Sequence, residues 1–286
     1  MSRLALAIVL AALAGGGPTR GVWTARASRW TVDDKGPTTL LQLSLRPRSG
    51  GGGDWNVSFP VPVDELRGLA AAQTEASRSE SGFSLVRDAG TFAFDGSFVS
   101  GEGAGHFTFT PSPEYVEGMK GLGYSGLDAA TLFSLAAHDA SRALVRELAS
   151  LGYARLSLDD LTSMGIHGAG PSFIRELKAL GYDNVPVDDL VSMRIHGARP
   201  EFIRELAGLG YARVPVDDLV TMRIHGVTPA FIRELKALGY SGVAVDDLVT
   251  MRIHGVTPDY VRSANRTGSR VSVDRLVEMR IHAEDP

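Results

Sequence analysis

Cysteine is absent from the 286 residues of the chain. This absence excludes disulfide bonds, thiolate zinc sites, a cysteine nucleophile and a lipid-modified cysteine anchor. Lysine is scarce, with four residues against 25 arginines. Basic residues are not in surplus, because the chain has 29 of them and 33 acidic residues, for a formal net charge of −4. A nucleic-acid-binding domain needs a basic surplus, so this balance argues against a nucleic-acid partner.

Long apolar runs are also missing, apart from one at the N-terminus. Leu4 to Ala14 is an unbroken apolar stretch of 11 residues that follows Arg3 and ends in the small-x-small pattern Ala12-Leu13-Ala14. The pattern is that of a secretory signal peptide, and it is too short to span a membrane, which takes about 20 residues. We therefore predict a signal peptide over residues 1–14, export to the periplasm or the extracellular space, and no stable membrane insertion after cleavage.

Catalytic motifs are missing as well. The sequence contains no His-Glu-x-x-His zinc helix, no Gly-x-Ser-x-Gly elbow and no P-loop. The glycine-rich stretch 101–105 resembles a nucleotide-binding loop only in its glycines, because no helix is expected behind it. We predict that the protein is not an enzyme and that it holds no cofactor and no metal ion.

The aromatic residues divide the chain near residue 110. All three tryptophans precede this point and all seven tyrosines follow it. Upstream, apolar and polar residues alternate in Gly21–Val32 and Thr38–Arg46, and phenylalanines recur at alternate positions between residues 83 and 109. This period of two is typical of half-buried strands. The sequence predicts a domain over residues 15–110 with about six antiparallel strands, folded as a small sandwich or half-open barrel with the phenylalanines inside.

Shorter elements are predicted between these strands. A further strand is expected over Asp54–Pro60 and one small helix over Pro62–Gln73, whose apolar residues are three or four positions apart. Turns are expected at Asp88-Ala89-Gly90, Asp95-Gly96 and Gly101-Glu102-Gly103, because these residues favour hairpin connections.

A repeat of 29 residues fills the remaining segment, 111–286. The same step separates tyrosines and histidines in parallel series: Tyr124, Tyr153, Tyr182, Tyr211 and Tyr240, with His138, His167, His196, His225 and His254. A fixed period of this length is typical of a solenoid. We predict about six two-helix repeats that form a solenoid of α-helical hairpins, which makes the fold class α+β with two domains.

The unit 228–255 shows how each repeat is expected to fold. Thr228 is a helix N-cap and Pro229 occupies the first helical position. Gly239 and Tyr240 fit a Schellman ending. A second helix is expected from about Val245, with two aspartates in its first turn, where the helix dipole favours them. Its apolar residues are expected to be Leu248, Met251 and Ile253.

Stacked repeats would turn each repeated polar residue into a row. The candidate ligand- or partner-binding residues are a basic row and an acidic row: Arg194, Arg223, Arg252 and Arg280, with Asp188, Asp217 and Asp246. Such rows could clamp an extended peptide or an acidic loop of a partner, with arginine as a bidentate donor. The alternative is that arginines of one repeat pair with aspartates of the next and only fix the stacking.

The histidine row predicts helix capping rather than a metal site. Zinc needs three or four ligands within about 2 Å of the ion, and equivalent residues in successive repeats are too far apart for that. A histidine just before the glycine that ends a helix is well placed to interact with the last carbonyl groups.

The repeat motif resembles a known group of sensor proteins. The stretches Met-Arg-Ile-His-Gly at 222–226 and Phe-Ile-Arg-Glu-Leu at 231–235, together with Asp88–Phe92 and Gly103–Phe109, are similar to the extracytoplasmic C-terminal regions of bacterial membrane metallopeptidases of the β-lactam-sensor antirepressor type. The peptidase part of that family, with its zinc helix, has no counterpart in this sequence, so no catalytic residue carries over. The resemblance implies a sensing or binding module.

Together, these observations predict an exported, non-enzymatic interaction protein that recognises a protein or peptide in the cell envelope. Two alternatives stay open at this point. The protein could be a regulatory partner of a membrane metallopeptidase, or a structural or adhesive surface protein.

Overall fold

The computed structural model describes residues 17–31, 37–48, 56–267 and 269–282. The predicted signal peptide, residues 1–14, lies outside them. The chain forms two compact units, Met1–Ile166 and His167–Pro286. Among the described residues, no helix combines the length and the apolarity that crossing a membrane would require.

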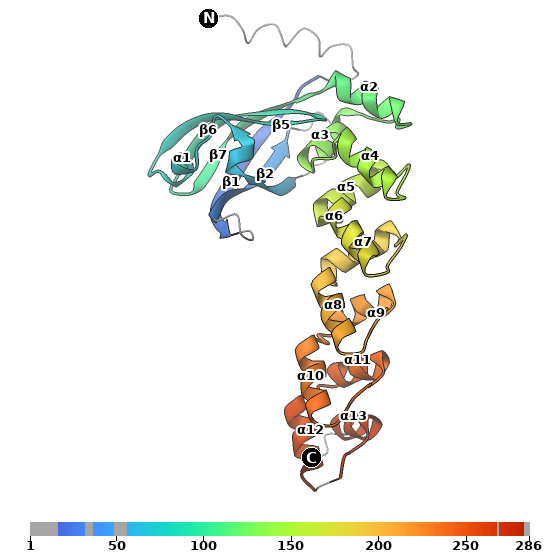
Figure 1. Cartoon of the computed structure of the whole chain (residues 1–286). Coiled ribbons are helices and arrows are strands. Elements are labelled where there is room, and N and C mark those ends of the chain that lie inside the picture. Colours follow the sequence, from blue (N-terminus) through green and yellow to red (C-terminus); the bar gives the residue numbers. More distant parts are fainter. Residues whose placement is uncertain (1–16, 32–36, 49–55, 268, 283–286) are drawn as a thin grey trace, which may run out of the picture. The chain divides into compact units, whose positions relative to one another are not determined.

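The first unit contains one antiparallel sheet of seven strands in the order β3-β2-β1-β7-β6-β5-β4 (Figure 1). The sheet curls into a half-barrel. This confirms the predicted half-barrel, and no second sheet is present among the described residues to make a sandwich. The strands are β1 (Thr19–Thr31), β2 (Pro37–Pro47), β3 (Val57–Pro62), β4 (Leu66–Arg67), β5 (Ser79–Arg87), β6 (Gly90–Val99) and β7 (Glu102–Pro111).

The helix predicted over Pro62–Gln73 is wrong. The chain instead forms a 3-10 turn at Val63–Glu65, the short strand β4, and a helix of five residues, α1 (Ala71–Glu75). Gly68, with a φ of +90°, separates the last two elements. Apolar residues three apart satisfy a helix and this irregular path equally well, so their spacing alone could not decide between them.

The turn predicted at Asp95-Gly96 is also wrong, because β6 runs straight through it. Gly96 lies opposite Gly105 of β7 in the strand register. A Cβ atom on Gly96, Gly103 or Gly105 would come within 2.7–2.8 Å of the Trp23 ring. These strand glycines therefore leave room for an indole that covers them from β1, a known device for filling the space above glycine in a sheet.

Trp23 is the centre of the aromatic core. Its ring centroid lies 5.4 Å from that of Phe83, 6.0 Å from that of Phe94 and 5.5 Å from that of Phe98. Its Nε1 donates a hydrogen bond to the Asp95 carbonyl oxygen at 3.2 Å. The predicted phenylalanine core is confirmed, and each such ring pair adds about 0.5–1.5 kcal/mol beyond the burial of its area.

Helix α3 covers the apolar face of the sheet within the first unit. Phe133 of α3 packs against Phe92, Phe107 and Phe109, with ring centroids 5.1, 5.7 and 5.3 Å away. Helix α3, which belongs to the repeat segment in sequence, is therefore part of the same core as the sheet. The helices of this unit that follow the sheet are α2 (Pro113–Gly121), α3 (Ala129–Ala137) and α4 (Arg142–Ser150), and α5 (Leu158–His167) ends one residue beyond it.

An ion pair ties the β5–β6 turn to α4. The Asp88 carboxylate accepts hydrogen bonds from the Arg142 backbone N–H at 2.8 Å and from the Arg142 Nη2 at 2.6 Å. Both side chains are about three-quarters buried, at 24% and 29% exposure. Hydrogen bonds from Arg142 hold the pKa of Asp88 below its ordinary value.

The second unit is built from paired short helices. The first helix of each repeat packs on the first helix of the next, so that α6 contacts α8, α8 contacts α10 and α10 contacts α12. The second helices form a separate series in the same way, from α7 through α9 and α11 to α13 (Figure 1). The bounds are α6 (Pro171–Ala179), α7 (Val187–His196), α8 (Pro200–Gly208), α9 (Val216–Ile224), α10 (Pro229–Ala237), α11 (Val245–Ile253), α12 (Pro258–Ala264) and α13 (Val273–Ile281).

The helix boundaries predicted within residues 228–255 are confirmed by α10 and α11. The Thr228 hydroxyl accepts a hydrogen bond from the Phe231 backbone N–H at 3.1 Å, as an N-cap does. At the other end of α10, Gly239 has a φ of +90° and the Tyr240 N–H donates to the Leu235 carbonyl at 3.0 Å. This is the hydrogen bond that defines a Schellman ending.

Replacing Gly105 with alanine tests the packing of Trp23. The new methyl group would meet the Asp95 carbonyl oxygen at 2.0 Å and the Trp23 Nε1 at 2.8 Å. We expect Gly105→Ala to lower the free energy of unfolding by about 1–3 kcal/mol, measured by urea denaturation with near-ultraviolet circular dichroism. Gly82→Ala is the matched strand control, because its Cβ would meet only the Phe94 carbonyl oxygen, at 4.0 Å. Equal losses in the two variants would contradict the close packing.

Replacing Asp88 with asparagine tests the ion pair. Since the folded-state pKa of Asp88 is lowered, the ionised carboxylate stabilises the fold above its unfolded pKa, and this contribution is lost as the pH falls through the folded pKa. We expect Asp88→Asn to be less stable than the wild type by about 1–2 kcal/mol at pH 7. The gap should narrow as the pH drops below about 4, in denaturant titrations repeated over that range. A gap independent of pH would argue against the charge effect.

Candidate functional site

The arginine row predicted as a binding surface lies over aromatic rings of the same repeats. The Arg223 guanidinium carbon is 5.1 Å from the centroid of the Phe202 ring. Its equivalents repeat this cation–π contact, with Arg194 over Phe173, Arg252 over Phe231 and Arg280 over Tyr260 at 5.3, 5.2 and 4.9 Å. Such contacts contribute about 0.5–2 kcal/mol, depending on how far the cation is desolvated.

The same arginines reach back to the end of the preceding repeat. Arg194 Nε donates to the His167 carbonyl oxygen at 3.1 Å, and Arg223 Nε donates to that of His196 at 3.4 Å. Arg280 does the same to the carbonyl oxygen of His254 at 3.4 Å. The cation thus lies at the negative end of a helix, where the dipole favours it. Burial lowers the pKa of Arg194 from its ordinary value.

Arg252 occupies the equivalent position with one difference. A Cβ atom on Gly226, at the preceding helix end, would lie 3.2 Å from its Nη2, so the guanidinium is against that backbone. Its buried Nε has no hydrogen-bond partner among the described residues. The geometry of the row favours the stacking alternative, but through rings and carbonyl groups rather than through the predicted aspartates.

Tyrosines make the complementary contact in the other direction, which the sequence did not reveal. The Tyr182 hydroxyl donates to the Val214 carbonyl oxygen at 2.7 Å, in the loop that precedes the second helix of the next repeat. Tyr211 and Tyr240 repeat this bond to Val243 and Val271, at 2.7 and 2.5 Å. The 29-residue period of the tyrosines is the only sequence feature that points to this contact. A Schellman ending explains the same period without any contact of the hydroxyl group.

Ion pairs between successive first helices add to the same boundaries. Arg204 pairs with Glu176 at 2.7 Å and Arg233 pairs with Glu205 at 3.2 Å. All four side chains are close to half exposed, and pairs of this kind contribute about 0–1 kcal/mol each. Charged side chains on the first helices are therefore largely paired with one another.

The three aspartates of the predicted acidic row are accessible to a partner. Asp188, Asp217 and Asp246 are exposed in the first turns of α7, α9 and α11. Among the described residues, no ion pair joins any of them to a basic side chain. Their carboxylates face solvent, where the N-terminal dipole of each helix favours them.

An exposed isoleucine follows each aspartate, and this was missed in the sequence. Ile253, grouped from the sequence with Leu248 and Met251 as an apolar residue of its helix, is 54% exposed, whereas the other two are buried. Its equivalents Ile195, Ile224 and Ile281 are 55%, 53% and 54% exposed. A helical wheel predicts this exposure, because at 100° per residue Ile253 lies opposite the side shared by the buried Leu248 and Met251.

Aspartate and isoleucine share one face of each second helix. Asp217 and Ile224 are seven residues apart, which is close to two full turns, so both point the same way. Because α7, α9, α11 and α13 are packed in series (Figure 1), their outward sides adjoin. We call this surface the isoleucine face, defined by Ile195, Ile224, Ile253 and Ile281.

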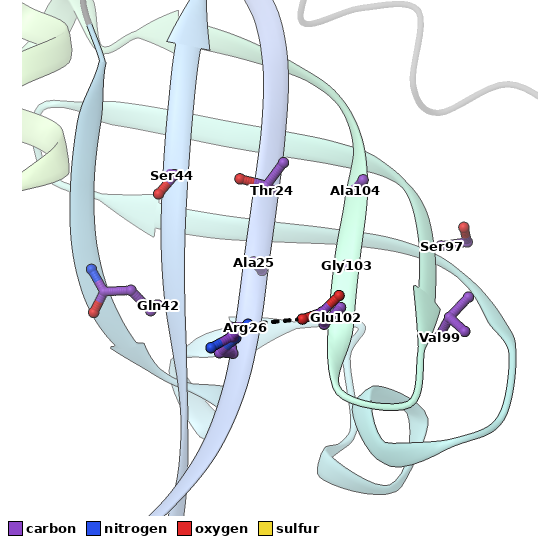
Figure 2. Close-up of a pocket in the computed structure, with 10 residues that line it drawn as sticks. All are labelled: Thr24, Ala25, Arg26, Gln42, Ser44, Ser97, Val99, Glu102, Gly103 and Ala104. Atoms are coloured by element: carbon purple, nitrogen blue, oxygen red, sulfur yellow. Dashed lines mark hydrogen bonds and ion pairs between the residues drawn. The ribbon is translucent and has the colours of Figure 1, made fainter.

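A hollow on the solvent side of the β sheet is a second candidate (Figure 2). It measures about 480 Å³ and lies across β2, β1, β7 and β6. Its lining includes Thr24, Arg26, Gln42, Ser44, Ser97 and Glu102. Arg26 and Glu102 pair with each other at 3.0 Å and are both well exposed. These groups suit hydrogen bonding to a polar ligand.

Metal ligands do not gather in the part of the chain that the structure describes, where no three histidine, aspartate or glutamate side chains are placed to hold an ion. Comparison with protein-family models and with curated proteins finds no match for this chain.

Replacing Arg223 with alanine tests the internal role of the arginine row. The change removes the contact with the Phe202 ring and the hydrogen bond to the His196 carbonyl. We expect the free energy of unfolding to fall by about 1–2 kcal/mol, measured by urea denaturation followed by far-ultraviolet circular dichroism. Arg223→Lys should recover only part of this loss, because an ammonium group cannot stack as a planar guanidinium does.

Lys236→Ala is the control, since it removes an exposed cation from a first helix. It should change the stability by no more than about 0.5 kcal/mol. Losses of the same size in the two alanine variants would mean that Arg223 acts only through overall charge.

Proposed function

We propose that the chain is an exported, non-enzymatic binding protein of the cell envelope whose C-terminal repeats form an α-helical-hairpin solenoid that recognises a protein or peptide. The observation that carries the proposal is the isoleucine face. One exposed isoleucine is ordinary in a soluble protein. The same residue at 53–55% exposure in four second helices of one unit makes an apolar surface that a partner would cover.

The solenoid part of the proposal is supported by contacts that join like helices of neighbouring repeats. First helices contact first helices, and second helices contact second helices. Tyr211 reaches forward to the next repeat and Arg223 reaches back to the preceding one. A solenoid is stabilised by such nearest-neighbour interfaces, and its repeated outer positions form an extended binding surface.

The chemistry left on the outside supports recognition rather than catalysis. The arginines are occupied by rings and carbonyl groups. The isoleucine face presents aliphatic side chains beside carboxylates, which suits contact with another chain. Export is supported by the pattern of residues 1–14. The sensor-type role is supported by the resemblance of the motif at 222–226 and 231–235.

Site-directed photo-crosslinking in cells that produce the protein tests this function. A photoreactive amino acid would replace Ile224 or Ile253, and in control variants it would replace Ala207 or Ala237, which are exposed on first helices. We expect discrete crosslinked proteins in the envelope fraction from the two isoleucine positions, and little or none from the alanine positions. Separation of the cell fractions would test export in the same samples.

Two results would overturn the proposal. The absence of a crosslink at either isoleucine position would leave that face without a partner. Equal crosslinking at all four positions would indicate random encounters.

A further inference from the structure

The isoleucine face carries enough detail to state what kind of segment it binds. We propose that it takes an extended, cationic segment of a partner protein that lies across the second helices in a polyproline II conformation, with a basic side chain at every third position. This inference rests on the proposed function, since it names the partner chemistry of the same face. It replaces the acidic partner that the arginine row suggested from sequence.

The charge of the isoleucine face indicates that the partner segment is positively charged. Asp188, Asp217 and Asp246 are exposed beside the isoleucines and have no ion pair among the described residues. The nearest repeated cations are turned away from this face, because Arg194 and Arg223 lie against rings and helix ends. The face therefore presents unmatched negative charge next to exposed aliphatic groups, and a basic segment is complementary to it.

The layout within each helix places the two rows at a useful distance. Asp217 and Ile224 are seven residues apart on α9, which corresponds to about 10 Å along the helix axis. Between them on the same side lie Val220 and Thr221, which are half-buried. A partner backbone that lies over these two residues would have carboxylates on one side and isoleucines on the other.

The spacing between helices decides the conformation of the partner. Packed helices lie about 8–10 Å apart, and three residues of polyproline II cover about 9 Å in one full turn. Residues three apart then point in the same direction and meet successive aspartates, while their neighbours meet successive isoleucines. A β-strand would cover a similar length, but side chains three apart would point to opposite faces of it.

A synthetic peptide provides the probe. It carries four copies of Lys-Val-Pro and a fluorophore, and its binding to the full-length protein is followed by fluorescence anisotropy. The test variant combines Asp188→Asn, Asp217→Asn and Asp246→Asn. The control variant removes the same charge from exposed positions outside the second helices through Asp183→Asn, Glu201→Gln and Asp259→Asn. Circular dichroism would verify that both variants fold.

We expect the test variant to bind the peptide at least about tenfold more weakly than the wild type, and the control variant to differ by less than about twofold. A peptide of the same composition in scrambled order should also bind about tenfold more weakly, because its lysines no longer meet successive aspartates. Combining Ile224→Ser with Ile253→Ser should weaken binding in the same way.

Equal losses in the test and control variants, or equal binding of the scrambled peptide, would overturn the inference in favour of general attraction between opposite charges. No binding of the ordered peptide would also overturn it. If photo-crosslinks at Ile224 and Ile253 were retained in that case, the proposed binding function would stand and only its cationic partner would be wrong. If both measurements failed, the function itself would fall.

Discussion

A helix of seven to ten residues is too short to be stable alone in water, and the α-helices α6 to α13 (without the 3-10 turn) of the second unit have these lengths. What holds them is the set of contacts that cross each repeat boundary. A tyrosine hydroxyl reaches forward, as in Tyr182 to Val214. An arginine reaches back over an aromatic ring to the preceding helix end, as in Arg223 to His196. Apolar side chains such as Leu190 and Met193 fill the space between.

This constraint also determines which residues remain for function. The arginines cannot both hold the helix ends together and project into a groove, and the structure places them in the former role. The aspartates and isoleucines of the second helices have no such internal contacts, so they are the repeated side chains that a partner can reach. The proposed binding surface is therefore the part of the repeat that the folding of the repeat does not use.

Much of this architecture could be predicted from the sequence, because local rules suffice for it. The Thr-Pro starts, the Gly-Tyr helix endings and the alternating strands follow from capping and periodicity. The contacts that depend on distant residues could not be predicted. Gly96 is expected in a turn until Trp23 is seen above it. Arg223 reads as a surface cation until the Phe202 ring is seen beneath it.

The isoleucines show a different limit. Apolar residues in a short amphipathic helix usually belong to the core, and residue type alone groups Ile253 with Leu248 and Met251. The residue lies on the far side of the helix from Leu248, which is fully buried. Residue type alone therefore does not predict the isoleucine face, whereas the angular position of each residue around the helix does.

Hydrogen–deuterium exchange of the full-length protein, compared between the wild type and Arg223→Ala, measures whether each repeat is held by its neighbours. The contacts of Arg223 predict faster exchange over residues 193–203, where α7 ends and α8 begins, and unchanged exchange in α13. Unchanged exchange over 193–203, or faster exchange confined to α9 itself, would mean that the neighbouring repeats do not hold one another through Arg223.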